Sequence, residues 1–181
     1  MAELALPVSD RDHVQGFVGA PVTLVEYGDY ECPHCTAAYP FVKVVQAEFV
    51  DDLCFAYRHF PLIQIHPYAE PAAEAAEAAG AQDRFWEMHD ELFQHSPDLD
   101  YPHLSAYAEL IGLDVGRFRR DLRSHHYQPR IIDDLESGLQ SGVKGTPTFF
   151  INGIRHQGGY DLPSLVAAIK VALSHGTAIR H

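Results

Sequence analysis

The stretch VTLVEYGDYECPHCTAAY, residues 22–39, joins an apolar run to a close pair of cysteines. Residues 22–27 are rich in β-branched and aromatic side chains, a pattern that predicts a buried strand. Cys32-Pro33 then predicts the start of a helix, because proline is favoured in the first turn, where its missing N–H costs nothing. Apolar residues recur at helical spacing up to about Val50. A strand is therefore expected to lead directly into a long helix that carries the cysteines near its start.

The pattern on either side of this stretch predicts an α/β fold with a helical insertion. Residues 53–58 form a second expected strand, so the order strand, helix, strand indicates a βαβ unit with a parallel pair. Residues 67–142 contain several amphipathic or Ala/Glu-rich segments and are expected to form an inserted helical subdomain. Residues 1–20 are expected to be a polar lead-in.

Strand pattern returns after Gly145, where residues 146–151 precede Asn152-Gly153, the strongest short signal for a hairpin. A closing helix is expected from Leu162 to about Ser174. The predicted core therefore comprises residues 1–66 and 143–181, in the order βαβ, then ββα, around the helical subdomain.

Composition and charge exclude several classes of protein. The 181 residues are 46% hydrophobic and 21% charged, which is ordinary for a globular domain. A formal net charge of −12 disfavours non-specific binding to nucleic acid or anionic lipid. No run approaches 18 apolar residues, so no membrane span is expected, and no signal peptide is visible. We expect a cytoplasmic protein, or a periplasmic or otherwise extracytoplasmic one if a leader was removed.

The two close cysteines have the spacing of a redox pair. Cys32 and Cys35 are three positions apart, so a helix places both sulfurs on one face. At a helix start, backbone N–H groups and the positive dipole end favour the Cys32 thiolate and depress its pKa. Cys35, one turn further on, is expected to be more buried. We also expect the protonated imidazole of His34 to stabilise the reduced form of the cysteine pair.

Two other roles for the pair are weaker. A structural zinc site needs four ligands, and the sequence offers no second cysteine pair or suitably spaced histidines. A structural disulfide over so short a loop would restrict the unfolded chain little. We therefore rank redox chemistry first, metal binding second and a structural brace third.

The motif CPHC after a strand, with the later segment Gly145-Thr146-Pro147-Thr148-Phe149-Phe150, resembles the DsbA-like thiol-disulfide oxidoreductases of the thioredoxin superfamily. The resemblance covers nearly the whole chain and implies a thioredoxin-like core with an inserted helical domain. It implies that Cys32 is the nucleophile and Cys35 the resolving thiol. It also implies a cis bond at Thr146-Pro147, with Thr146, Pro147 and Pro33 contacting the substrate.

The resemblance assigns Glu26, on the first strand, to moving the proton of Cys35. The lysine that partners this acid in the family has no clear equivalent, and Arg58 is the candidate substitute. Cys54 is expected to be a small buried hydrophobe. His59 and His66 are expected to be ordinary surface or loop histidines.

The function that these residues predict is exchange of a dithiol and a disulfide with cysteines of protein or peptide substrates. Glutathione or a redox partner protein is a further possible exchange partner. No organic cofactor and no metal are expected, since the dithiol itself carries the electrons. Two alternatives stay open: a metal-binding thioredoxin-like module, and a glutathione-dependent isomerase or transferase on the same fold. Replacing Cys35 separates the glutathione-dependent alternative from the thiol-disulfide oxidoreductase.

Overall fold

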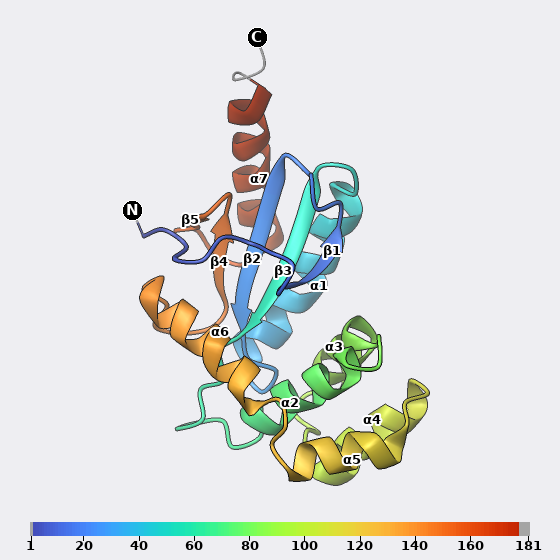
Figure 1. Ribbon diagram of the computed structural model, residues 1–181. Coiled ribbons are helices and arrows are strands. Elements are labelled where there is room, and N and C mark those ends of the chain that lie inside the picture. Colours follow the sequence, from blue (N-terminus) through green and yellow to red (C-terminus); the bar gives the residue numbers. More distant parts are fainter. Residues whose placement is uncertain (1, 178–181) are drawn as a thin grey trace. The chain divides into compact units, whose positions relative to one another are not determined.

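The computed structural model describes residues 2–177 of the chain and shows a five-stranded sheet with seven helices in that range (Figure 1). The elements in chain order are β1 His13–Gly16, β2 Val22–Gly28, α1 Pro33–Glu48, β3 Leu53–His59, α2 Ala69–Gly80, α3 Phe85–Gln94, α4 Tyr101–Leu110, α5 Val115–Arg123, α6 Gln128–Gln140, β4 Thr148–Ile151, β5 Ile154–Arg155 and α7 Leu162–Thr177. The described chain divides into two compact units, one built on the sheet and the other on helices.

The first unit comprises residues up to 28, 37–58, and from 137 onward. Its sheet has the order β1-β3-β2-β4-β5. The amide of Val22, at the start of β2, donates to the carbonyl of Asp52, directly before β3, so both strands begin at the same edge and run parallel. The βαβ unit predicted from the sequence is therefore confirmed, and β4 then pairs with β2 in the antiparallel direction.

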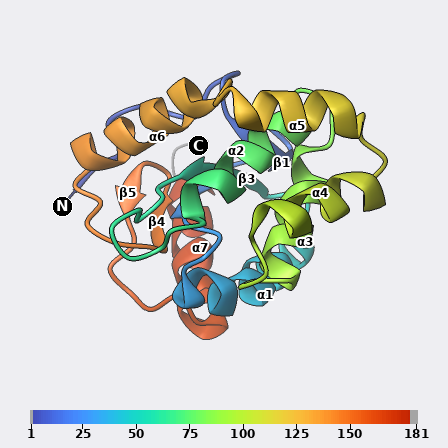
Figure 2. The same ribbon diagram turned by 90° about the horizontal axis from the view of Figure 1, so that it is seen from below.

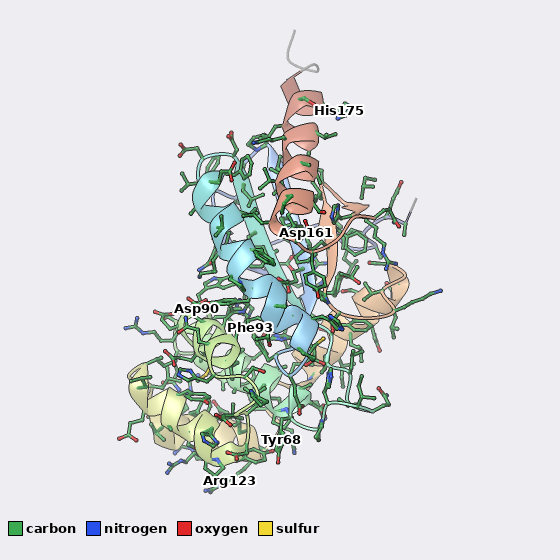
Figure 3. All side chains as sticks on the ribbon, turned by 180° about the vertical axis from the view of Figure 1, so that it is seen from behind. Tyr68, Asp90, Phe93, Arg123, Asp161 and His175 are labelled. Atoms are coloured by element: carbon green, nitrogen blue, oxygen red, sulfur yellow. The ribbon has the colours of Figure 1, made fainter. Side chains whose placement is uncertain are left out.

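Helices α1 and α7 cover the same face of this sheet (Figures 1 and 2). Helix α7 contacts β2 and β4. Asp161 caps it, because its carboxylate accepts from the amide of Ser164 at 3.0 Å. Figure 3 shows Asp161 and His175 at its two ends. The predicted closing helix is thus present, and the Asn152-Gly153 turn joins β4 to β5 with both residues at positive φ.

The sequence analysis was wrong about the start of the chain. Residues 13–16 form β1, an edge strand antiparallel to β3, where a polar lead-in was expected. The strand ends at Gly16, whose φ is +90° and whose added Cβ would lie 2.3 Å from the carbonyl oxygen of Leu53. Its pattern is too short and too polar to predict a strand, and pairing with β3 decides its conformation.

The second unit comprises residues 29–36 and 59–136. Its central helix is α2, which contacts α3, α4 and α5 and buries all its alanines. Small side chains allow these helices to approach closely. Residues 67–142 were expected to form this block. The structure groups 59–136 together with the segment that carries the two cysteines.

No helix among the residues that the structure describes is both long and apolar enough to cross a membrane.

Candidate active site around Cys32 and Cys35

Cys32 stands at the start of α1, as the sequence predicts. The helix begins at Pro33, and the Cys32 carbonyl accepts the first helical hydrogen bond from the Thr36 amide at 3.0 Å. Cys35 is the third residue of the helix. The side chains differ little in exposure, because Cys32 is 3% and Cys35 0% exposed. The asymmetry between them therefore lies in their positions along the helix, with Cys32 at the positive end of the dipole.

Pro33 and His34 occupy the first turn of α1 between the cysteines, and both side chains are exposed. The roles expected for His34 and Pro33 stay predictions.

Asp29 organises the turn that precedes Cys32. Its carbonyl accepts from the Cys32 amide at 3.1 Å. One carboxylate oxygen accepts from the Glu31 amide at 2.8 Å, and the other accepts from the Leu62 amide at 2.9 Å. The second oxygen also bonds the Nδ1 of His66 at 2.8 Å. The carboxylate is fully buried, and these three bonds compensate for its loss of water.

His66 lies in the loop after β3, close enough to the cysteines for the charge of Cys32 to act on its imidazole. Partial burial alone would lower the pKa of its imidazole. The hydrogen bond to Asp29 and the charges of Asp29, Cys32 and Glu31 outweigh burial, so the pKa of His66 lies above its usual value. The expectation of an ordinary loop histidine is wrong, since the side chain is only 15% exposed and pairs with Asp29. The two residues are 37 positions apart, and no local pattern links them.

His59 is also not a surface residue, because it is 1% exposed. Its Nε2 lies 2.8 Å from a carboxylate oxygen of Glu77 on α2, and its amide donates to Asp134 at 3.0 Å. Sequence reasoning missed this pairing because α2 looked like a plain Ala/Glu helix. These contacts of His59 therefore lie within the helical unit.

Tyr30 anchors the cysteine segment in the same unit. Its hydroxyl lies 2.9 Å from Nδ1 of His89, and its ring centroid lies 4.8 Å from that of Phe93, which is labelled in Figure 3. Tyr30 and His89 are both almost fully buried. Phe85 and Phe93 of α3 are buried as well, so both belong to the core of the helical unit.

Glu26, Thr146 and Pro147 belong to the first unit. Glu26 is 2% exposed on β2 and lies opposite Phe149 in the antiparallel register with β4. The Thr146–Pro147 peptide bond is cis, as is Ser96–Pro97. Pro147 directly precedes β4, so the cis bond and the buried carboxylate lie on neighbouring strands.

Arg58 does not replace the family's lysine as a partner of Glu26, because it binds Asp12 instead. Its Nε and one terminal nitrogen bond both carboxylate oxygens of Asp12, at 2.7 and 3.1 Å. Its remaining N–H groups donate to the Tyr27 hydroxyl and to the carbonyls of Leu6 and Pro7. These contacts occupy all five donors of the guanidinium, so none is left for a second carboxylate.

Cys54 lies on β3 and is 1% exposed, as expected of a small buried side chain. Burial raises the pKa of its thiol, and the charge of Asp12 raises it further. Both effects keep the thiol protonated and unreactive near neutral pH.

A metal site receives no support from the side chains. Among residues 2–177 the structure brings together no group of three His, Cys, Asp or Glu side chains that could hold a metal ion.

Comparison with known proteins identifies the class of the chain. A family model described as thioredoxin matches residues 9–171. The chain therefore belongs to the thioredoxin family, and its fold is that of the DsbA-like members. Oxidised BdbD from Bacillus subtilis superposes with a TM-score of 0.85 at 24% identity, over 96% of this chain and 98% of that one.

Two further solved structures show the same fold. A thioredoxin-like oxidoreductase from Silicibacter pomeroyi DSS-3 gives a TM-score of 0.81 at 25% identity, over 92% of this chain and 94% of that one. The α-DsbA1 protein of Wolbachia pipientis gives 0.82 at 20% identity, over 98% of both chains.

The similar curated sequences carry a different name. A protein named Na(+)/H(+) antiporter NhaA 1 from Salinispora arenicola is 49% identical over 98% of this chain and 27% of its own length. One named NhaA 3 from Salinispora tropica is 47% identical over 95% of this chain and 26% of its own length. The chain thus spans about a quarter of the length of these relatives.

Proposed function

We propose that the protein is a thiol-disulfide oxidoreductase that exchanges electrons between the Cys32–Cys35 pair and cysteines of protein or peptide substrates. The observation that carries this proposal is the placement of Cys32 at the first turn of α1, with Cys35 three residues later, in a chain of the thioredoxin family. A helix start favours a thiolate, and the thiolate is the species that reacts with disulfides.

The exchange transfers two electrons. In the oxidising direction, a substrate thiolate attacks the Cys32 sulfur of the Cys32–Cys35 disulfide, and a mixed disulfide forms as the original bond breaks. Cys35 leaves as a thiolate and takes up a proton. A second substrate thiolate then attacks the substrate sulfur, which releases Cys32 as a thiolate and completes the substrate disulfide. The reducing direction is the reverse of these steps.

The other residues of the proposed site act on these steps. Glu26, a buried carboxylate, would supply and remove the proton of Cys35. Thr146, at the cis bond, would pair its backbone with an extended substrate, and Pro147 and Pro33 would contact that peptide. His34 would stabilise the reduced pair when protonated.

A trapping experiment tests the proposal. The variant Cys35→Ser retains the attacking sulfur but lacks the resolving one. It should attack a disulfide-bonded peptide, release one peptide thiolate, accumulate the mixed disulfide between Cys32 and the other peptide cysteine, and lose turnover in insulin reduction. Cys54→Ser is the matched control and should behave as the wild type. Undiminished turnover of Cys35→Ser with glutathione would instead favour the glutathione-dependent alternative. A stoichiometric metal ion held by the purified reduced protein would favour the metal-binding alternative.

We also propose that this chain corresponds to a redox unit that accompanies an ion transporter in the relatives named antiporter. The identity of 49% over 98% of this chain supports this, and so does the lack of a membrane-spanning helix among the described residues. Ion exchange in those relatives would then belong to the other three quarters of their length. The protein, added to sodium-loaded liposomes, should exchange disulfides but move no sodium, and sodium movement would contradict the proposal.

A further inference from the structure

We propose that His66 is a positioning residue for the Cys32 thiolate, since the positive charge that Asp29 holds beside the active-site turn stabilises the reacting sulfur. This inference rests on the proposed function and adds a residue to it. It also predicts that the rate of disulfide exchange depends on the protonation of His66.

The geometry that supports this role begins with Asp29. Its buried carboxylate binds the Glu31 amide in the turn before Cys32, and the Leu62 amide and the His66 ring in the loop after β3. These bonds fix the ring of His66 against the turn that leads into Cys32. The carbonyl of the same aspartate accepts from the Cys32 amide, so one residue positions both the cation and the cysteine.

The charges around His66 also support the role. The groups that act on it are Asp29, Cys32 and Glu31, and the charge of each of them favours the protonated imidazole. Coulomb interaction between two groups is mutual, so a protonated His66 favours the Cys32 thiolate to the same extent. Both carboxylates oppose the thiolate. His66 offsets them, together with the start of α1.

The loop from β3 to α2 is held against this turn by a second contact. The amide of Tyr68 donates to the carboxylate of Glu31 at 2.6 Å, next to Cys32 in the sequence. His66 lies between Leu62 and Tyr68, so its backbone is tied on both sides. The imidazole therefore does not need to be ordered at the moment of reaction, which favours an electrostatic role.

The decisive variants either remove the positive charge of His66 or make it permanent, and both retain a hydrogen-bond donor for Asp29. In His66→Gln, the fraction of Cys32 thiolate at pH 6, followed by absorbance at 240 nm or by iodoacetamide labelling, should fall about three- to tenfold. The disulfide should become correspondingly less oxidising against glutathione. His66→Arg keeps a permanent charge and should retain the reactive thiolate, while its rate profile should lose the step due to imidazole titration.

His103→Gln is the matched control. His103 on α4 bonds the carboxylate of Asp100 at 2.7 Å, but the two side chains are 48% and 44% exposed. This variant should leave the thiolate fraction unchanged. An equal thiolate fraction in the wild type and His66→Gln would overturn the inference. If the wild type itself showed no disulfide exchange, the proposed function would fail instead.

Discussion

Two aspartates in this molecule bind basic side chains, and the two sites differ in whether the charge of the basic side chain depends on pH. In the sheet unit, Asp12 binds Arg58, and both side chains are 4% exposed. In the helical unit, Asp29 binds His66, whose side chain is 15% exposed. Arginine stays charged at every pH of interest, whereas histidine changes charge near neutrality.

The difference indicates two uses of the same kind of ion pair. All five donors of Arg58 are engaged, two by Asp12, one by Tyr27 and two by backbone carbonyls near the N-terminus. That site fixes the segment before β1 onto β3 and cannot respond to pH. The pair of Asp29 and His66 fixes a loop as well, but the charge of its histidine changes with pH and acts on Cys32.

The largest effect is expected from breaking the fixed pair. Arg58→Met leaves Asp12 buried without its cation, which should lower the free energy of unfolding by about 3–5 kcal/mol. Urea denaturation measures the loss. Arg84→Met is the control, because the pair of Arg84 and Glu87 is 53% and 44% exposed and should contribute under ~1 kcal/mol. Equal losses of unfolding free energy in both variants would show that the buried pair contributes no more to stability than the exposed one.

A smaller loss is expected at the second aspartate. Asp29→Asn keeps one acceptor oxygen where the carboxylate has two, so at least one donor of the turn loses its partner. The expected cost is about 1–3 kcal/mol in the free energy of unfolding, measured in the same way. A loss as large as that of Arg58→Met would remove the distinction between the two sites.

A still smaller effect on stability is expected from replacing Cys54, the cysteine near Asp12. Burial, and then the charge of Asp12, raises the pKa of Cys54, whereas a protonated His66 places a positive charge near Cys32. Cys54→Ala should cost about 1 kcal/mol of stability and leave disulfide exchange unchanged. In the folded reduced protein, Cys54 should be alkylated more slowly than Cys32. Mass spectrometry of labelled peptides measures the order, and faster labelling of Cys54 would contradict it.

The smallest effect is a pH dependence of stability. The pKa of folded His66 lies above its usual value near ~6.5, so its stabilising contribution is full below that pH and is lost as pH rises through the folded pKa. The difference in unfolding free energy between the wild type and His66→Gln should therefore shrink by under ~1 kcal/mol from pH 5.5 to 8.5. The contribution of Arg58 should stay constant over that range. A difference that grows with pH would reverse the sign expected for His66.

Local pattern predicted most of the elements of the fold. The run from Val22 to Tyr27 became β2, Pro33 became the first residue of α1, and Asn152-Gly153 became the turn between β4 and β5. Each depends on interactions within a few residues, namely side-chain alternation, the fixed φ of proline and tolerance of positive φ. The edge strand β1 could not be predicted from local pattern, because its pairing with β3 decides its conformation.

The features of the candidate site also divide into those that local sequence predicts and those that depend on distant residues. Cys32 and Cys35 follow from their spacing at a predicted helix start, and the burial of Glu26 follows from its apolar neighbours. The partners of the charged residues do not follow, because a chain with 25 acidic residues and 12 histidines offers many equivalent pairs. Arg58 was suggested as the partner of Glu26 and binds Asp12, 46 positions away.

The amino-acid sequence by itself determined that a strand leads into a helix with a cysteine at its N-terminus. Short-range steric preferences and helix capping depend only on residues close together in the chain. Only the tertiary structure decided which acid neutralises which base. Charges separated by tens of residues are brought together by packing of apolar surfaces, and this packing placed the imidazole of His66 beside the turn of Cys32.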